Sequence, residues 1–216
     1  MQRTWQEDRA LVFYDPNVRT GFGFSAEAER ARVERQLAFA HVIKASKDDI
    51  ALLYPGRSFR EIAAAWQGTM SGLVAVTLGS AGVYALAPDG TEIYLPAAAA
   101  EVVDTVGAGD AFAAAILDRL AAKVAGVAAA GPDAAAAAAP DAAAPDAAAP
   151  DAAAAVRRIS ADVLRGLLER ASVSAALTCE RAGAQSPDAR TLDAAMEEQP
   201  RRALEAQHQE IGLEPA

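Results

Sequence analysis

The sequence predicts an α/β protein whose mostly parallel sheet is covered by helices on both faces. Residues 73–78 form an apolar run, Leu-Val-Ala-Val-Thr-Leu, of the kind found in strands buried on both sides. Shorter apolar runs at 11–14 and 41–43 alternate along the chain with stretches rich in Ala, Glu and Arg. Alternation of buried strands with helices is typical of parallel β-α-β units.

Helices are expected at three places between these strands. Residues 25–40 begin with Ser25, a suitable N-cap, and place Val33 and Leu37 at helical spacing. A short helix is expected at 46–53. The Ser-Phe-Arg-Glu sequence at 58–61 has the pattern of a capping box, so it predicts the start of another helix.

The centre of the chain predicts a hairpin and then a helix. The Gly-Ser-Ala-Gly sequence at 79–82 ends the strongest strand. Residues 83–86 and 92–95 then have the pattern of two strands joined at Asp89-Gly90, a dipeptide that favours tight hairpin turns. An apolar, Ala-rich helix is expected at 107–122.

We expect the chain to be organised in four segments. Residues 1–123 form the first part of the core. Residues 124–155 are mostly Ala, interrupted by Pro-Asp at 132, 140, 145 and 150, which predicts a low-complexity insertion without stable helix. Structure is expected to resume at Val156, with closing helices over 156–190 that include apolar segments at 159–168 and 173–179, and a charged tail at 191–216.

Composition limits the classes of function. Twenty basic against 29 acidic side chains give a net charge of −9, which argues against nucleic-acid binding. A single cysteine, Cys179, excludes an intrachain disulfide and favours a reducing compartment. The N-terminal residues lack the apolar region of a signal peptide, and no apolar run is long enough to cross a membrane. We therefore expect a cytoplasmic protein with no membrane partner.

The strand, glycine-rich turn and helix around 104–110 predict a phosphate site. Glycines let the backbone approach a ligand closely, and the first amides of a helix are unpaired donors at the positive end of its dipole. Gly107, Ala108 and Gly109 would direct such amides at a phosphoryl group, and Asp110 would accept a proton from an attacking hydroxyl. The pattern fits neither the dinucleotide-binding nor the P-loop sequence. A glycine turn with no ligand is the alternative that the spacing alone leaves open.

The full string Asp-Thr-Val-Gly-Ala-Gly-Asp-Ala-Phe at 104–112 resembles the C-terminal signature of PfkB carbohydrate kinases. Four further segments, at 15–19, 44–49, 77–82 and 175–184, are similar to bacterial fructokinases and occur in the same order. The resemblance implies a ribokinase-like three-layer sandwich that uses ATP and Mg²⁺ to phosphorylate a sugar hydroxyl.

The resemblance also implies roles for individual residues. Asp110 would be the catalytic base, and Gly107, Ala108 and Gly109 the anion hole. The nucleotide would contact Thr77, Gly79, Ser80, Gly82, Thr105, Cys179 and Gly183, while the phosphates or the substrate would lie near Asn17, Arg19 and Lys44. For Cys179 itself, a buried unreactive thiol is the favoured interpretation.

Ser46 and Asp49 align with the family's Asn-x-x-Glu motif, which is tied to Mg²⁺ and phosphate. Asp49 would then act on the metal through water, because Asp is one methylene shorter than Glu. Ser-x-x-Asp before a helix is also a capping arrangement, and the two interpretations have equal weight.

The chain departs from the family ahead of Asp15. Family members carry a longer N-terminal portion with a Gly-Gly sugar-recognition motif, the first strands of the sheet and a β lid, and the 14 residues before Asp15 contain nothing like it. Three hypotheses follow: a fructokinase-like enzyme whose front lies outside this sequence, an inactive remnant that at most binds nucleotide, or a related kinase acting on a nucleoside or another hydroxylated substrate. The sequence also leaves open that the protein forms a homodimer.

Overall fold

The computed structural model describes residues 11–19, 25–70, 72–124 and 152–198. Strands are β1 (Phe13–Tyr14), β2 (Val42–Ser46), β3 (Leu73–Thr77), β4 (Val83–Leu86) and β5 (Glu92–Leu95). Helices are α2 (Ala26–Leu37), α3 (Lys47–Leu53), α4 (Phe59–Met70), α5 (Ala108–Val124), α7 (Ala152–Arg157) and α8 (Ala161–Cys179), with a 3-10 turn, η1, at Gly79–Ala81. Residues 189–198 are also helical.

The strands form one sheet in the order β1-β2-β3-β4-β5. The first three strands are parallel, and the pairing of Ser46 with Thr77 brings the carboxyl ends of β2 and β3 to the same level. β4 and β5 are antiparallel to their neighbours, which confirms the predicted hairpin around Asp89-Gly90. The sheet is therefore mixed, with parallel pairing on the side that includes β1.

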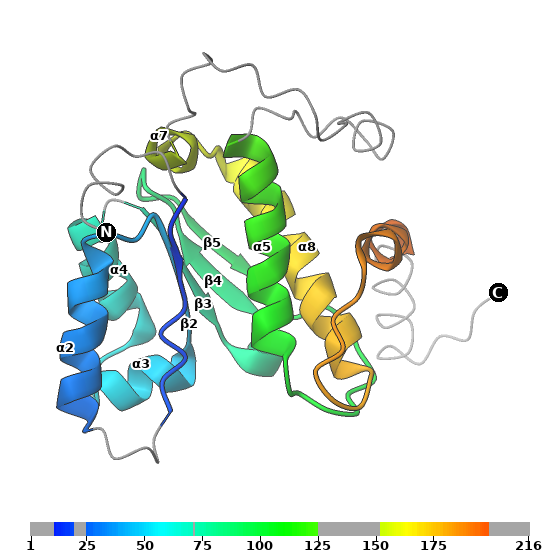
Figure 1. The fold of residues 1–216 in the computed structure, drawn as a ribbon, viewed down its shortest axis with the longest axis horizontal. Coiled ribbons are helices and arrows are strands. Elements are labelled where there is room, and N and C mark those ends of the chain that lie inside the picture. The colour runs from blue at the N-terminus through cyan, green and yellow to red at the C-terminus, as the bar shows by residue number, and fades with distance from the viewer. Residues whose placement is uncertain (1–10, 20–24, 71, 125–151, 199–216) are drawn as a thin grey trace, which may run out of the picture.

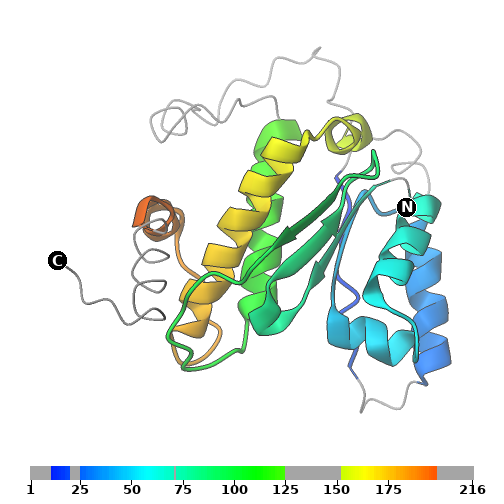
Figure 2. The same ribbon diagram turned by 180° about the vertical axis from the view of Figure 1, so that it is seen from behind.

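Helices cover both faces of this sheet, so the predicted three-layer arrangement is confirmed (Figures 1 and 2). α2, α3 and α4 pack on one face, and α5 and α8 on the other. Successive strand residues alternate between the two cores: Leu73 and Ala75 pack with α5 and α8, whereas Val74 and Val76 pack with α2, α3 and α4. A strand between two apolar layers must be apolar throughout, and this explains the unbroken run at 73–76.

Serine side chains begin several of the helices, as the sequence predicts. The Ser25 Oγ accepts a hydrogen bond from the Ala28 N–H at 3.2 Å, and Ser160 caps α8 in the same way. At α4, the Ser58 Oγ accepts the Glu61 N–H while the Glu61 carboxylate accepts the Ser58 N–H. These bonds pair amides that the first turn of a helix leaves without partners.

Two expectations for the closing segments were wrong. The apolar segments at 159–168 and 173–179 were expected to be separate, but 161–179 is one helix. Small residues such as Ala171 and Ser174 let α8 lie close along α5, where the Ser174 hydroxyl donates to the Ala111 carbonyl at 3.2 Å. Helix also begins at Ala152, before the predicted restart at Val156. The rest of the predicted insertion, 125–151, lies outside the described residues.

The charged tail predicted at 191–216 was also wrong in part, because the described residues up to 198 are helical. Leu192 is buried in the core formed with α5 and α8. Beside it, the Asp193 Oδ1 accepts a hydrogen bond from the buried guanidinium of Arg170 at 2.5 Å and lies 3.7 Å from Arg119. Apolar packing, which also includes Ala195 and Met196, and the charge of Asp193 therefore hold this helix, although its sequence pattern is weak.

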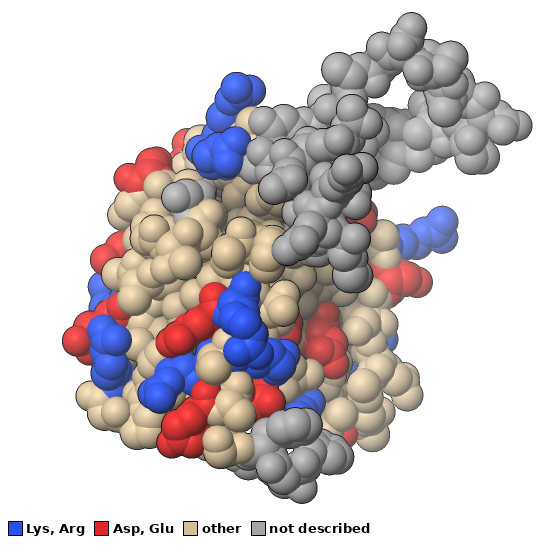
Figure 3. All heavy atoms as spheres, turned by 60° about the vertical axis from the view of Figure 1, so that its left-hand side comes forward, with Lys and Arg blue, Asp and Glu red and all other residues tan. Residues whose placement is uncertain are grey.

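The surface carries both signs of charge close together. Figure 3 shows basic and acidic side chains interleaved on one face of the molecule. On α2, Glu29 pairs with Arg32 at 2.6 Å, one turn along the helix. None of the described helices has the length and hydropathy needed to cross a membrane.

We predict that Asp193→Ala lowers the free energy of unfolding by about 1–3 kcal/mol, because the buried Arg170 guanidinium loses its acceptor. Urea denaturation followed by circular dichroism measures the change. Glu197→Ala is the matched control, since Glu197 is exposed on the same helical segment. Equal stability of the two variants would contradict the docking of this helix.

Candidate active site

A cleft of about 810 Å³ opens at the carboxyl ends of β2 and β3. Ligands of open parallel sheets bind at this edge, outside the strand ends. Opposite the strands lie the first turn of α5 and the last turns of α8. Residues on the strand side include Lys44, Ser46, Lys47, Asp48, Thr77, Gly79, Ser80 and Gly82; those opposite include Val102, Thr105, Ala108, Gly109, Phe112, Ser172, Ala175, Ala176 and Cys179.

The glycine-rich turn before α5 is held by the carboxylate of Asp104. Its Oδ1 accepts the Val106 N–H at 3.0 Å and its Oδ2 accepts the Gly183 N–H at 2.9 Å. The backbone reinforces this link, because the amides of Val103 and Asp104 both donate to the Cys179 carbonyl, at 2.8 and 3.1 Å. The turn and the segment after α8 are therefore one connected unit, although 79 positions separate Asp104 from Gly183.

Hydrogen bonds and burial set the ionisation of two groups beside this turn. The Val106 and Gly183 amides stabilise the charged form of Asp104 and so lower the pKa of its carboxyl. Desolvation raises the pKa of the Cys179 thiol, and the nearby charges of Asp104 and Glu180 raise it further. The raised pKa favours the thiol form, as expected of an unreactive cysteine, but the prediction that Cys179 is buried was wrong: it is half-buried and lines the cleft.

Backbone N–H groups without hydrogen-bond partners lie at the start of α5, next to the cleft. Within the described part of the chain, the N–H groups of Gly107, Gly109 and Asp110 have no acceptor, whereas the Ala108 N–H reaches the Thr105 carbonyl at 3.3 Å. Gly107 has a φ of 82°. This left-handed conformation reverses the chain so that the following amides point out of the helix end. Such an arrangement suits an anion.

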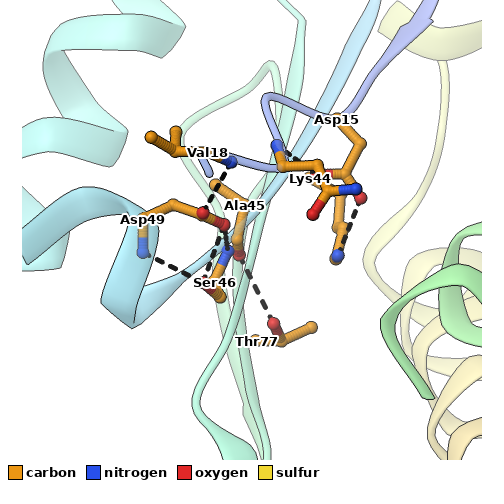
Figure 4. Close-up of polar contacts among 8 residues, drawn as sticks. Asp15, Val18, Lys44, Ala45, Ser46, Asp49 and Thr77 are labelled. Atoms are coloured by element: carbon orange, nitrogen blue, oxygen red, sulfur yellow. Dashed lines mark hydrogen bonds and ion pairs between the residues drawn. The ribbon is translucent and has the colours of Figure 1, made fainter. Parts of the chain in front are cut away.

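Lys44 supplies a cation at the same point. Its side chain is buried, and its Nζ donates to the Asp15 Oδ2 at 2.8 Å (Figure 4). The Nζ also lies 2.9 Å from the position that a Cβ on Gly109 would occupy. The ammonium group therefore rests against the first turn of α5, and a side chain at position 109 would displace it.

Asp49 forms the capping arrangement that was one of its two predicted roles (Figure 4). Its Oδ2 accepts from both the N–H and the hydroxyl of Ser46, at 2.9 and 2.7 Å, and its Oδ1 accepts the Val18 N–H at 2.9 Å. A carboxylate has about four acceptor positions, so three are used. No cluster of three or more His, Cys, Asp or Glu able to hold a metal occurs among the described residues.

The loop after β1 is fixed from the α2 side as well. Arg32 donates to the Tyr14 hydroxyl at 3.2 Å and to the Pro16 carbonyl at 3.3 Å. Asn17 adopts a φ of 41°, and both Asn17 and Arg19 are exposed. Neither of these two lines the cleft, so their predicted contact with phosphate or substrate stays a prediction.

The structure brings most of the predicted site residues together. Those that line the cleft are Lys44, Thr77, Gly79, Ser80, Gly82, Thr105, Ala108, Gly109 and Cys179. Gly107, Asp110, Gly183 and Asp49 adjoin it without lining it, and Asp110 is exposed at the start of α5. Sequence reasoning missed that Asp15 is the partner of Lys44. An Asp directly after one parallel strand and a Lys in the middle of the next strand are a usable signal.

Residues 4–191 match the pfkB family of carbohydrate kinases. The chain belongs to this family. It is 34% identical over 110 residues to a fructokinase of Rhizobium leguminosarum bv. trifolii, a match covering 51% of this chain and 33% of that protein. A fructokinase of Klebsiella pneumoniae is 37% identical over 115 residues, covering 51% and 36%. The aligned region thus spans about a third of these relatives.

Solved structures agree with the fold of this pfkB-family chain. Fructokinase of Xylella fastidiosa with bound ATP superposes with a TM-score of 0.68 at 19% identity, covering 92% of this chain and 57% of that one. A double mutant of fructokinase from Vibrio cholerae O395, with fructose, ADP and potassium bound, gives 0.60 at 23% identity, covering 85% and 49%. These likenesses establish the ribokinase-like fold.

We predict that Asp104→Asn speeds hydrogen exchange at the Val106 or Gly183 amide, because an amide side chain has a single oxygen and cannot accept from both. Exchange followed by NMR measures this. Asp89→Asn, which removes a similar carboxylate in the hairpin turn, should leave these two amides unchanged.

The pH dependence of this link has a defined sign. Because the folded pKa of Asp104 is lowered, its contribution to stability is full above the ordinary pKa of about 4 and is lost as pH falls through the lower folded value. The stability difference between the unmodified chain and Asp104→Asn should therefore shrink below about pH 4. Urea denaturation at several pH values measures it, and a constant difference would contradict the assignment.

We predict that Gly107→Ala destabilises the fold by at least about 1–2 kcal/mol, the cost of a left-handed non-glycine residue. The added Cβ would also lie 2.9 Å from the Ala184 Cα. Gly166→Ala is the matched control: it lies within α8, with open space around its Cβ position, and should stabilise by about 0.5–1 kcal/mol. Thermal and urea denaturation compare the two.

Proposed function

We propose that the protein phosphorylates a sugar hydroxyl at the expense of ATP, as a fructokinase-like enzyme. The observation that carries the proposal is the meeting of the buried Lys44 ammonium with the unpaired amides at the start of α5. Two positive groups converge there at one end of a cleft large enough for a nucleotide. Fructokinase relatives from several organisms support the sugar as acceptor.

In the proposed reaction, the substrate hydroxyl attacks the terminal phosphorus of ATP. The bond from phosphorus to the bridging oxygen breaks, ADP leaves, and the hydroxyl proton passes to the Asp110 carboxylate. Asp110 lies in the first turn of α5 and is exposed, so its carboxylate is accessible to an acceptor. Such transfers need mainly positioning and charge stabilisation, so a correctly placed carboxylate and cationic surroundings are sufficient parts.

The amides of the turn would form the anion hole. Gly107 and Gly109 have free N–H groups, and Ala108 would have to release its 3.3 Å bond to Thr105 to contribute. The Asp110 amide is a further free donor that the sequence pattern did not suggest. Lys44 would add a full positive charge beside these dipoles, as phosphoryl-transfer sites require.

The nucleotide would occupy the part of the cleft between the β3–β4 connection and the end of α8. Thr77, Gly79, Ser80 and Gly82 would contact it from the β3–β4 connection, and Thr105, Cys179 and Gly183 from the opposite side. Small apolar residues, among them Ala175 and Ala176, line this part of the cleft. A flat aromatic base fits between such walls.

We propose Mg²⁺ as the metal for this chemistry. The described residues are consistent with an ion that the protein itself binds only weakly. Asp49 retains about one free acceptor position, which suits contact with the ion through water. Mg²⁺ commonly keeps several waters and binds to phosphates with only one or two carboxylates. When bound, the ion would neutralise charge on the phosphates.

Two alternatives remain as competing proposals. An aminoimidazole riboside kinase of Salmonella typhimurium is 27% identical over 115 residues, which favours a nucleoside-like acceptor as the second candidate. The third is a chain that binds nucleotide without transferring phosphate. The cleft residues described above concern the nucleotide and the transferred phosphate, which the sugar kinase and the nucleoside kinase would share, so the assays below distinguish the acceptors.

Asp110→Asn should lower turnover by orders of magnitude while leaving ATP affinity nearly unchanged, since the carboxylate acts on the acceptor. A coupled ADP-release assay and calorimetric titration with ATP measure the two quantities. Asp118→Asn is the control, because Asp118 is exposed two turns further along α5. Collapse of ATP affinity in Asp110→Asn would instead assign Asp110 a structural role.

Acceptor specificity is tested by assaying the unmodified chain with fructose, other hexoses, ribose and nucleosides. Fructose-dependent ADP release that Asp110→Asn abolishes supports the first proposal, and a preference for a riboside supports the second. ATP binding without any acceptor-dependent turnover would support the binding-only alternative.

A further inference from the structure

We propose that Asp15 is a positioning residue that holds the Lys44 ammonium group at the phosphoryl end of the cleft. The proposal rests on the function proposed above, because it assigns Lys44 to the transferred phosphoryl group. Asp15 itself does not line the cleft, and it would act on the ligand only through Lys44.

Lys44 needs a holding group because its side chain is long and flexible. It extends from the middle of β2, where its backbone pairs with Ala75. Side-chain entropy disfavours any single position for a free lysine amine. Here only 7% of the Lys44 side chain and 19% of the Asp15 side chain are exposed. Water therefore screens their attraction less than it would at the surface.

The position of the Lys44 amine determines whether it can contact a bound phosphate. Beside Gly109, the ammonium lies at the positive end of the α5 dipole, which repels a second positive charge. Asp15 offsets that repulsion when no anion is present. Among the described residues, the Lys44 amine has Asp15 as its one hydrogen-bond acceptor, which leaves two of its three N–H groups for phosphoryl oxygens.

Asp15 can fix another side chain because it is itself fixed. Its Oδ1 accepts the Asn17 N–H at 3.1 Å. The residues on either side of it are held by Arg32, through the Tyr14 hydroxyl and the Pro16 carbonyl. Further along the loop, the Val18 N–H donates to Asp49. Contacts from both α2 and α3 thus set the position of the carboxylate.

A merely structural ion pair would link β1 to β2 and have no effect on the ligand, so the test must separate the two roles. We suggest calorimetric titration of the full chain with ATP and with ADP, for the unmodified protein, Lys44→Met, Asp15→Asn and the double variant. Urea denaturation of each protein shows that the variants fold.

Lys44→Met should weaken ATP binding about tenfold to a hundredfold, the value of one charge-assisted hydrogen bond, and change ADP binding much less. Asp15→Asn should also weaken ATP binding, because the amine is released. When Lys44→Met is already present, adding Asp15→Asn should leave ATP affinity unchanged or raise it. Without the lysine, Asp15 acts on the phosphates only by repelling them, and Asp15→Asn removes that repulsion. This dependence on Lys44 identifies a positioning role.

Asp15→Glu provides a second test that keeps the charge. Displacing the carboxylate by one methylene should weaken ATP binding as Asp15→Asn does. If Asp15→Glu binds ATP as tightly as the unmodified chain, the proposal is overturned. It is also overturned if Asp15→Asn changes ATP affinity by the same amount and in the same direction whether or not Lys44 is present. Glu92→Gln, which removes an exposed partner of Arg60, is the control for losing an ion pair elsewhere.

The outcomes also separate this inference from the proposed function. If the unmodified chain binds neither ATP nor ADP, the proposed function fails and the role of Asp15 fails with it. If it binds ATP and the variants show no coupling between positions 15 and 44, only the role of Asp15 is overturned.

Discussion

The parallel pairing of β1, β2 and β3 is the constraint on which the cleft depends. Parallel strands end at the same edge of a sheet, so residues far apart in the sequence become neighbours there. Asp15 follows β1, Ser46 ends β2, and Thr77 ends β3. Hydrogen bonds then connect these ends: Lys44 reaches back to Asp15, and Asp49 binds both Ser46 and the loop after β1. The polar side chains of this edge thus form one network before any ligand is present.

The chain combines a negative overall charge with a locally positive cleft. Its net charge is −9, yet the end of the cleft near Gly109 holds a buried ammonium group and unpaired helix amides. Interactions between exposed charges are screened within about 8–10 Å, so distant acidic residues contribute little there. Local geometry therefore sets the preference for an anion, and net charge sets only the behaviour of the outer surface.

The sequence predicted the strands and most of the helices, because these depend on local patterns, and most of the residues singled out through the family resemblance line one cleft. Apolar runs, Ser caps and the Asp-Gly turn act over a few residues, and the glycine-rich string is a long pattern. Features that arise from contacts between distant segments were missed. The helix at 189–198 depends on Arg170 and on the core around Leu192, and its own sequence carries little signal. Likewise, Asp15 and Lys44 are 29 positions apart, and only the strand pairing brings them together.

The link between Asp104 and Gly183 joins the beginning of α5 to the segment that follows α8. The chain leaves α5 at Val124 and returns at Ala152, at the opposite end of these helices from the cleft (Figure 1). Seventeen helical residues separate the two ends of α5, a distance of about 25 Å. Because Asp104 ties the two helices together at the cleft end, the residues that line the cleft on α5 and α8 are held next to each other where a ligand would bind.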